Sequence, residues 1–353
     1  MEKKMDKADL RFIAWELTQS CNLNCLHCRG SATSERNQEE LSFEECRKFL
    51  DEVKSFAEPV IILSGGEPLK RPDVFEIAEY GTFKGLRVVL ATNGTLLSDV
   101  IAKDLKKCGI KRVSISLDGS TDESHDTFRG IKGGYDRALA GIENLKSAGL
   151  PFQVNTTITR RNLDDLEQIL ENVIKLGAAA LHIFLLVPTG RGKLIEDEEI
   201  APDDYERVLE WFYNKQTEVS IGFKATCAPH YFRIASQKGG LKQMARNSSH
   251  GFEAMSRGCL GGISFCFVSY RGEVYPCGYL PLLCGNIREN NLENIWNRAE
   301  IFNNLRDYDK LKGKCGICEF KRLCGGCRAR AYAAVGDYLA EEPYCIYKPK
   351  QQF

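Results

Sequence analysis

The 353-residue chain predicts an α/β fold with a parallel sheet, followed by a cysteine-rich C-terminal domain. Three observations support this prediction. From residue 12 to residue 187, short stretches rich in β-branched and aromatic residues alternate with amphipathic, charged segments. Glycine and polar residues stand directly after most of these stretches, and beyond residue 255 the chain becomes dense in cysteine and glycine.

Six stretches are predicted to be strands. In chain order they read RFIAWELT, VIILSG, LRVVLATN, RVSISLD, FQVNTTIT and LHIFLLVP. The amphipathic segments between them are predicted to be helices, including residues 43–56, 98–108, 135–148 and 163–176. Strand–helix units of about thirty residues imply right-handed crossovers, so the sheet is either open or curved into a partial barrel.

Ligand sites of parallel α/β sheets lie at the C-terminal ends of the strands. Cysteine, glycine and polar residues of this chain occupy those positions. Cys21 follows the first predicted strand, and SGGEP, TNGT, SLDG and PTGRG end the second, third, fourth and sixth. We therefore expect one rim of the sheet to carry the functional site.

The alternation stops after Gly192, and the chain is expected to have three parts. These are an α/β barrel domain at 1–195, a connecting segment at 196–255 that contributes to the substrate site, and the cysteine-rich domain at 256–353. A Lys-, Gly- and Ser-rich span up to about residue 249 predicts a flexible connector. The last domain is expected to be organised by metal ligands more than by an apolar core.

Composition excludes several classes of function. Lys plus Arg and Asp plus Glu number 48 each, so no overall positive field favours nucleic acid. No apolar run is long enough to span a bilayer. The opening MEKKMDKADLRF has no apolar segment behind its charges, so we expect a cytoplasmic protein. Fifteen cysteines in a reducing compartment indicate metal or redox chemistry rather than disulfides.

The first unusual motif is CNLNCLHC, with Cys21, Cys25 and Cys28. Three thiolates at this spacing can bind three irons of a cubane cluster and leave the fourth iron without a protein ligand. An incomplete protein shell leaves a position for a substrate or a reactive group. The alternative is a zinc knuckle with His27 as the fourth ligand. In SGGEP, the glycine pair lets the backbone approach a ligand, and Glu67 can pair with an ammonium group.

CNLNCLHC after a first strand, with SGGEP one unit later, resembles the radical S-adenosylmethionine (SAM) superfamily. The resemblance implies a partial (β/α)6 TIM barrel whose 4Fe–4S cluster binds SAM and cleaves it to a 5′-deoxyadenosyl radical. Cys21, Cys25 and Cys28 would be the catalytic cluster ligands. The implied SAM contacts are His27 at the adenine, Gly65, Gly66 and Glu67 at the amino group, Ser116 and Asp118 at the ribose, Arg129 at the carboxylate, and Asn93, Asn155 and Thr157 along the pocket.

Structural roles remain alternatives for several of these residues. His27 would then be a partly buried histidine at a helix start, and Arg129 a solvated arginine at a helix edge. Asn93, Asn155 and Thr157 would be turn formers at strand ends.

The C-terminal cysteines resemble the SPASM arrangement, C-x(9–15)-G-x4-C, then C-x2-C-x5-C-x3-C, then C. Cys259 precedes Gly272 and Cys277 at the right spacing, but CGGC has two residues between its cysteines where the pattern has three. The resemblance implies two auxiliary 4Fe–4S clusters, and so three clusters in all. The implied ligands are Cys259, Cys266, Cys277 and Cys327 for the first, with Cys284 as the alternative to Cys266, and Cys315, Cys318, Cys324 and Cys345 for the second.

A zinc ribbon between residues 315 and 327 is the alternative for the second set. Cys46 and Cys108 fall within helix patterns and are expected to be buried as small apolar residues.

KATCAPHYFRI, GCLGGISFCFVS and CGGCRARAY resemble the heme b synthases of the siroheme-dependent pathway. That resemblance implies a tetrapyrrole substrate, iron-coproporphyrin III, two of whose propionates become vinyl groups by oxidative decarboxylation. It also implies a low-potential electron donor such as ferredoxin or flavodoxin. The alternatives are another siroheme-derived tetrapyrrole-modifying enzyme and a maturase of ribosomal peptides. From other classes, they are an iron–sulfur electron carrier and a zinc-stabilised binding module.

KATCAPHYFRI is expected to lie at the porphyrin site, because a macrocycle with four carboxylates needs cations and its iron can take a ligand. For His230 the alternative is a satisfied structural histidine, and for Cys227 an inert buried thiol. The expected substrate residues are Lys224, Cys227, His230, Tyr231, Arg233, Arg191 and Arg257.

Overall fold

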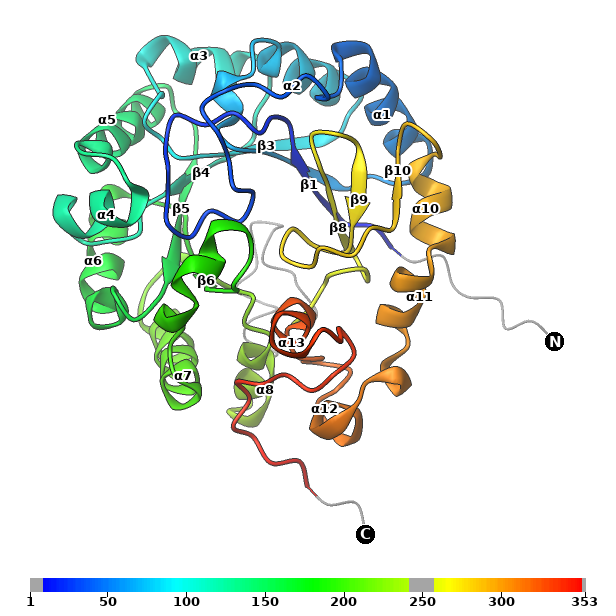
Figure 1. Ribbon diagram of the computed structural model, residues 1–353. Helices are drawn as coiled ribbons and strands as arrows, with labels where there is room; N and C mark the ends of the chain where they lie inside the picture. Colours follow the sequence, from blue (N-terminus) through cyan, green and yellow to red (C-terminus); the bar gives the residue numbers. More distant parts are fainter. Residues whose placement is uncertain (1–8, 241–256, 351–353) are drawn as a thin grey trace.

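The computed structural model describes residues 9–240 and 257–350. Most of its strands run parallel in one ten-stranded sheet of order β10-β9-β8-β1-β2-β3-β4-β5-β6-β7, and the helices form an arc outside them (Figure 1). The predicted α/β fold is therefore confirmed. The strands of the barrel are β1 (Phe12–Glu16), β2 (Val60–Ser64), β3 (Arg87–Thr92), β4 (Val113–Ser116), β5 (Phe152–Ile158), β6 (Ala180–Leu185) and β7 (Gly222–Thr226).

The helices between these strands begin and end close to the predicted residues. α1 begins after Ser42, whose side chain and that of Glu45 form a capping box, and it buries four side chains three or four residues apart. The helices that cover the barrel are α1 (Phe43–Phe56), α2 (Val74–Phe83), α3 (Asp99–Lys107), α4 (Asp122–Arg129), α5 (Gly134–Ser147), α6 (Leu166–Leu176) and α7 (Pro202–Glu218).

The segment at 196–255 does more than connect. It adds α7, strand β7 parallel to β6, and helix α8 (His230–Gln237). The part of the predicted flexible connector beyond residue 240 lies outside the described residues.

The C-terminal domain also joins the sheet. β8 (Phe265–Val268) pairs parallel with β1, and β9 (Glu273–Tyr275) and β10 (Gly285–Asn286) follow antiparallel. The three predicted parts of the chain therefore share one sheet. The remaining helices are α10 (Leu292–Arg298), α11 (Glu300–Arg306), α12 (Gly313–Ile317) and α13 (Arg328–Val335).

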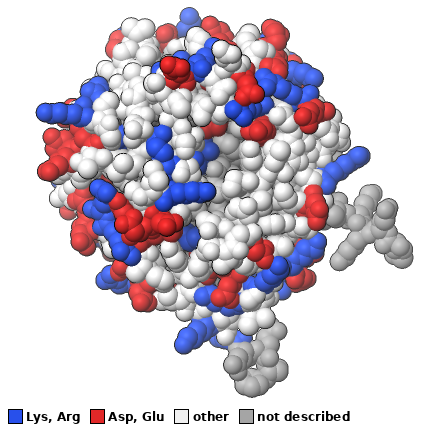
Figure 2. All heavy atoms as spheres, in the orientation of Figure 1, with Lys and Arg blue, Asp and Glu red and all other residues white. Residues whose placement is uncertain are grey.

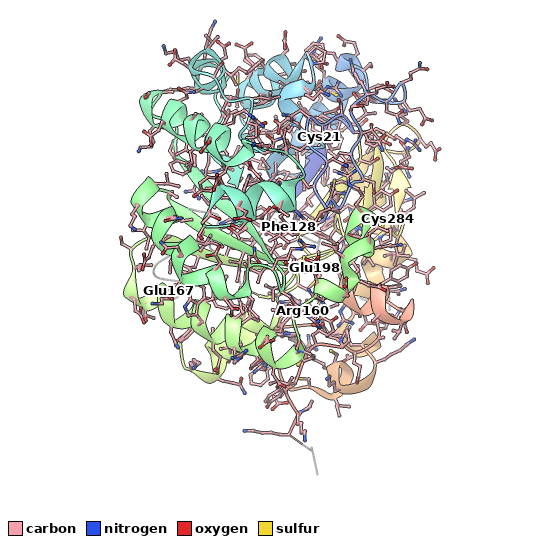
Figure 3. All side chains as sticks on the ribbon, turned by 60° about the vertical axis from the view of Figure 1, so that its left-hand side comes forward. Cys21, Phe128, Arg160, Glu167, Glu198 and Cys284 are labelled. Atoms are coloured by element: carbon pink, nitrogen blue, oxygen red, sulfur yellow. The ribbon has the colours of Figure 1, made fainter. Side chains whose placement is uncertain are left out.

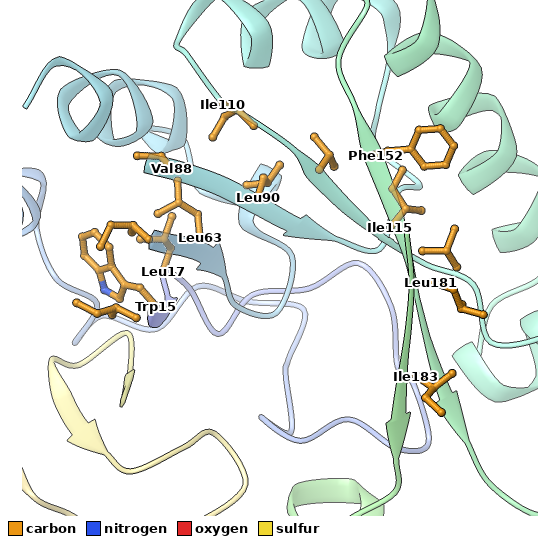
Figure 4. Packing of buried hydrophobic residues seen from close by; sticks show 14 of the residues in the cluster. Trp15, Leu17, Leu63, Val88, Leu90, Ile110, Ile115, Phe152, Leu181 and Ile183 are labelled. Carbon is orange, nitrogen blue, oxygen red and sulfur yellow. The ribbon is translucent and has the colours of Figure 1, made fainter. Parts of the chain in front are cut away.

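Side chains alternate between two faces of each strand, and the two faces differ in chemistry. One face packs against the helices as a continuous apolar core, which includes Trp15, Leu63, Leu90 and Ile115 (Figure 4). The opposite face points into the barrel. Because small and polar residues occupy much of that inner face, the barrel interior stays open.

Among the described residues, no helix is long and apolar enough to cross a membrane.

Candidate functional site

The loop after β1 carries the three-cysteine motif at the predicted rim. Cys21 and Cys25 are buried and Cys28 is half-buried (Figure 3 labels Cys21). Backbone hydrogen bonds hold the loop at several points, including Cys21 N to Thr33 O at 2.7 Å and Leu26 N to Phe128 O at 3.1 Å. The three thiols therefore have defined positions without a helix or strand of their own.

The SGGEP loop packs directly on the chain that leads to Cys21. Gly66 N donates to Thr18 O at 2.8 Å, and Glu67 N donates to Ser20 O at 2.7 Å. A Cβ at residue 66 would lie 2.4 Å from Ser20 O, so only glycine permits this approach. The glycine pair thus couples the end of β2 to the cysteine loop.

Glu67 is fully buried, and its carboxylate joins two strand ends. It accepts hydrogen bonds from Thr92 Oγ1 at 2.8 Å, Asn93 N at 2.8 Å and Leu69 N at 3.1 Å. Burial raises the pKa of this carboxyl above its ordinary value. The structure shows Glu67 as an anchor of the rim, and its pairing with an ammonium group stays a prediction.

Asn93 lies beside the first cysteine, as a residue of the pocket would. Its amide nitrogen is 2.9 Å from Asn22 Oδ1 and 3.9 Å from Cys21 Sγ, while its oxygen accepts a hydrogen bond from Thr95 N. The turn after β3 is therefore tied to the cysteine loop.

Asp118 and Arg129 form a buried ion pair with 2.6 Å between Oδ2 and Nε. Asp118 also accepts a hydrogen bond from Thr157 N at 2.7 Å and the Asp118 amide donates to His125 Nδ1 at 3.2 Å. Its side chain has no exposed surface, and its contact with a ribose stays a prediction. It orients Arg129.

Arg129 is not a solvated helix-edge residue. Its Nη1 lies 3.7 Å from Cys25 Sγ, and the side chain is nine-tenths buried. Burial alone would lower its pKa, but the Asp118 carboxylate and the Cys25 thiol raise it above its ordinary value, so the guanidinium stays charged. A fixed cation beside Cys25 favours the thiolate that a cluster requires.

His27 lies in a turn rather than at a helix start. Its ring stacks on Phe128 at 4.1 Å between centroids, and its Nε2 is 3.5 Å from Asp118 Oδ2. Burial lowers its pKa to about 4, so the imidazole is neutral near pH 7. One face of the ring is covered by Phe128, and a contact with adenine stays a prediction.

The strand-end residues Ser116 and Asn155 lie opposite each other in the register of β4 and β5. Both are half-buried, and Asn155 accepts a hydrogen bond from Gln153 Nε2 at 3.1 Å. Thr157 presents its backbone N–H to Asp118. These residues lie near one rim as predicted, and their contacts with SAM stay predictions.

A cavity of about 310 Å³ occupies the barrel interior and opens to solvent. Its walls are inward residues of the barrel strands on one side and cysteines of the C-terminal domain on the other. In Figure 2, which has the orientation of Figure 1, residues other than Lys, Arg, Asp and Glu cover much of the centre of the molecule, and Lys and Arg side chains lie beside them. Its polar and charged lining includes Arg29, Arg112, Gln153, Asn155, His182, Lys224 and Arg328.

Five of those lining residues were absent from the sequence predictions: Arg29, Arg112, Gln153, His182 and Arg328. Arg29 follows Cys28, pairs with Glu16 at 2.9 Å and lies over the Phe267 ring at 4.4 Å. Arg112, Gln153 and His182 alternate with apolar residues in or beside their strands. Polar residues therefore recur at every second position in parts of RVSISLD, FQVNTTIT and LHIFLLVP. This alternation could have identified the residues that point into the barrel.

The C-terminal cysteines fall into two groups. Cys327 lines the large cavity with two other thiols, which matches the crossed ligation that the SPASM resemblance implies. The cavity group contains Cys259, Cys277 and Cys327, together with Cys227. A separate small pocket is lined by Cys315, Cys318, Cys324 and Cys345.

Cys266 does not join the cavity group, contrary to prediction. It is fully buried in β8, where it faces the apolar core beside Cys284 and Arg306. Cys284 is half-buried in that same place and is equally remote from the cavity lining. Because β8 pairs with β1, its alternation turns residue 266 toward the helices.

Both groups of thiols suit iron–sulfur clusters. Within the described residues, no three His, Cys, Asp or Glu side chains converge in a way that would hold a single metal ion. A cubane presents a separate iron to each of its thiolates, so it fits thiols spread around a pocket. The cavity group and the pocket group are arranged in that manner.

Most residues of the predicted substrate segment point elsewhere. His230 Nε2 lies 2.6 Å from Glu342 Oε2, and both residues are fully buried. Tyr231 packs on Phe212 in the core at 5.6 Å between ring centroids, and Arg233 pairs with Glu206. α8 begins at His230, and none of these three residues lines the cavity, so their contact with the substrate stays a prediction.

Arg191 and Arg257 are also engaged outside the cavity. Arg191 Nε donates to Cys25 O at 3.0 Å and Nη1 to Ala32 O at 2.7 Å, so it stabilises the cysteine loop. Arg257 lies over the Tyr308 ring at 4.5 Å. Neither lines the cavity, whereas Lys224 and Cys227 do, and the substrate contacts of all four stay predictions.

Known proteins share this fold and these motifs. A family model described as the radical SAM superfamily matches residues 15–173, and a SPASM model, described as an iron–sulfur cluster-binding domain, matches residues 259–327. Streptococcus suis SuiB bound to S-adenosylmethionine has the same fold, with a TM-score of 0.76 over 96% of this chain and 78% of that chain at 17% identity. The chain therefore belongs to the radical SAM enzymes and carries a SPASM domain.

Relatives that match over nearly their whole length show to which family of radical SAM enzymes the chain belongs. AdoMet-dependent heme synthases of Methanosarcina barkeri and Nitratidesulfovibrio vulgaris are 59% and 47% identical, over 96–97% of this chain and 97% and 93% of their own lengths. A Fe-coproporphyrin III synthase of Methanosarcina barkeri is 32% identical over 96% of this chain and 88% of its own. Within the radical SAM enzymes, the chain belongs to the family of the AdoMet-dependent heme synthases.

Gly66→Ala is expected to slow SAM cleavage about tenfold or more, because the added Cβ would push the loop off the segment before Cys21. The measurement is 5′-deoxyadenosine formation by reconstituted protein under reducing conditions. Gly192→Ala is the matched control, since the nearest heavy atom to its added Cβ is 3.6 Å away. Equal rates in the two variants would contradict the role of this close approach.

The free energy of unfolding is expected to fall by roughly 2 kcal/mol between pH 7 and pH 5 through His125 alone. Burial lowers the pKa of this imidazole from 6.5 to about 4. Below pH 6.5 the unfolded chain binds a proton here that the folded chain does not bind, so stability is lost as the pH falls toward 4. Anaerobic denaturant titrations should show a smaller loss for His125→Gln than for the wild type. The same loss in both proteins would rule this contribution out.

Proposed function

We propose that the protein converts two propionates of iron-coproporphyrin III to vinyl groups and so forms heme b. The supporting observation is the large cavity between the inner face of the barrel strands and the cysteines of the C-terminal domain, whose lining includes several cations, among them Arg29 next to Cys28. Full-length relatives named AdoMet-dependent heme synthase support the same substrate class. We further propose three 4Fe–4S clusters, one at the N-terminal loop and two at the C-terminal cysteine groups.

The reaction requires the removal of one hydrogen atom and one electron for each propionate. Cys21, Cys25 and Cys28 would hold the cluster that, with SAM, supplies the radical chemistry for removal of a hydrogen atom from the β-carbon. The carboxylate then leaves as carbon dioxide, the carbon–carbon double bond forms, and one electron departs. An auxiliary cluster is the proposed acceptor of that electron, and ferredoxin or flavodoxin the proposed donor for SAM cleavage.

The residues of this chain perform the binding and positioning. Arg129 holds its positive charge beside Cys25, while Glu67 and the glycine pair fix the rim on which SAM would lie. Lys224 offers a cation to a propionate from within the cavity wall.

Lys224 is well suited to bind a carboxylate. It projects from β7 into the cavity, with Nζ 5.7 Å from the centre of the Phe12 ring. Burial lowers its pKa to about 8, and no carboxylate pairs with it among the residues that the structure describes. A propionate in the cavity would therefore provide the missing counter-charge.

The proposed function is tested by anaerobic incubation of reconstituted protein with SAM, reductant and iron-coproporphyrin III. Mass analysis should show stepwise loss of two formic acid equivalents and a final product with the mass of heme. A variant with Cys21, Cys25 and Cys28 all replaced by Ala should give neither 5′-deoxyadenosine nor product. SAM cleavage by the wild type with an unchanged porphyrin would refute the assignment of the substrate.

Lys224→Met is expected to weaken porphyrin binding about ten- to a hundredfold, since it removes one charge-assisted contact and keeps the side-chain length. Titration of iron-coproporphyrin III, followed by the Soret band, measures the affinity. Wild-type affinity should also fall as the pH rises through 8, and the variant should lack that step. Lys238→Met, at the exposed end of α8, is the control. Wild-type affinity in Lys224→Met would exclude this contact.

A further inference from the structure

Four thiols meet at one wall of the large cavity, and one of them does not come from the C-terminal domain. Cys259, Cys277 and Cys327 belong to the SPASM cysteines, whereas Cys227 lies in the loop between β7 and α8 of the barrel. A SPASM-type first auxiliary cluster requires four thiolates for full ligation, and the expected fourth, Cys266, is buried elsewhere. The group therefore lacks one ligand unless Cys227 supplies it.

The side chains of these cysteines are close neighbours. Those of Cys227 and Cys327 are near enough to share a hydrogen bond. Cys227 and Cys277 also pack against the buried hydrophobic cluster that contains Cys327, and Cys259 lines the same cavity. All four are enclosed by protein on the side away from the cavity.

The backbone at Cys227 is held in a conformation that a side chain disfavours. Its φ is +58°, in the left-handed region where glycine or asparagine is usual. The Cys227 carbonyl accepts hydrogen bonds from Tyr205 OH at 2.6 Å and Arg330 Nη1 at 2.9 Å. Strained residues of this kind cluster at functional sites, where the surroundings impose them.

Arg330 couples the two cysteines that lie closest together. It stands three residues after Cys327, in the first turn of α13, and reaches across to the Cys227 carbonyl. One buried side chain thus sets both the start of α13 and the loop after β7. Arg330 therefore links the segment that carries Cys227 to the helix that follows Cys327.

Cys266 offers a clear contrast. Its thiol belongs to the apolar core of β8, with Cys284 and Arg306 as its charged or titratable neighbours. No residue of the cavity group is among them. A cluster at the cavity wall could take Cys266 as a ligand only if β8 left its register with β1.

We propose that Cys227 is the fourth thiolate ligand of the auxiliary cluster held by Cys259, Cys277 and Cys327. The proposal rests on the first auxiliary cluster of the proposed function and is independent of the identity of the substrate. It reassigns Cys227 from a candidate ligand of the porphyrin iron to a ligand of the protein's own cluster.

Two consequences follow for the molecule. A cluster with four cysteine ligands has no open iron for substrate, so its role is electron transfer or structure. The cluster would also tie the loop after β7 to the C-terminal domain across the open side of the barrel, where α13 lies between α8 and α11 (Figure 1). The cavity wall would then depend on the cluster.

The test uses the full chain with Cys21, Cys25 and Cys28 replaced by Ala, so that only auxiliary clusters remain. Into this parent are introduced Cys227→Ala, Cys227→Ser, and Cys266→Ala as the matched control. Iron and sulfide are counted after anaerobic reconstitution, and electron paramagnetic resonance (EPR) spectra are recorded for reduced and for ferricyanide-oxidised protein. Cys227→Ser keeps the size of the side chain, so its spectrum is informative even if Cys227→Ala folds poorly.

The parent is expected to hold roughly eight iron atoms, as two 4Fe–4S clusters. Cys227→Ala should either fall to about four iron atoms or give a 3Fe–4S signal on oxidation that the parent lacks. Cys227→Ser should shift the EPR signal of one reduced cluster, whereas Cys266→Ala should match the parent in iron and spectra.

Parent-like iron and spectra in both Cys227 variants would overturn the proposal, and so would loss of a cluster in Cys266→Ala. A parent with only about four iron atoms, all lost on Cys324→Ala, would overturn it together with the three-cluster assignment. Heme formation by the wild type would still stand in that case, so the two failures are distinguishable.

Discussion

The two halves of the molecule meet at one buried guanidinium, that of Arg330, which is only 2% exposed. It donates to the carbonyls of Leu186 at 2.8 Å and Cys227 at 2.9 Å, and so reaches the ends of two barrel strands from a helix of the C-terminal domain. Glu199 and Glu342 balance its charge. Because a guanidinium carries five donors in a rigid plane, one residue can hold three segments that are far apart in the sequence.

The cavity depends on this junction. Its strand wall is the inner face of the barrel, and its thiol wall belongs mainly to the C-terminal domain. Tyr279 and Arg29 lie between the N-terminal triplet and the auxiliary thiols, since Tyr279 is within electrostatic reach of Cys28, Cys227 and Cys277. A substrate in the cavity would therefore lie between the site where a radical forms and the proposed site of electron removal.

Apolar and polar side chains occupy opposite faces of the barrel strands. Trp15, Leu63 and Leu90 pack outward against helices, while the buried His182 and the half-buried Lys224 line the cavity. Burial disfavours the charged forms of both inward side chains, which lowers the pKa of each. Burying charged or polar side chains without partners costs free energy, and a ligand that brings carboxylates into the cavity would reduce that cost.

Local sequence signals were sufficient for the elements and motifs. The helix at 43–56 was predicted to the residue because a capping box and a 3.6-residue apolar period both mark it. The six strands and the rim were predicted for a similar reason, since alternation and turn residues are local properties. β7 and β8 were missed as members of the barrel sheet because short strands far along the chain acquire their neighbours only on folding.

The sequence by itself determined the order of strands and helices, the three cysteine groups and the family to which they belong, because spacing along the chain carries that information. Only the tertiary structure decided which side chains meet. It paired Asp118 with Arg129, turned His230 and Arg233 away from the cavity, and replaced Cys266 with Cys227 at the cavity wall. The reason is geometric, because the direction of a side chain depends on how its helix or strand is rotated about its own axis. Pairing with β1, far earlier in the chain, sets that rotation for β8. Packing on α7 and the pairing of His230 with Glu342 set it for α8.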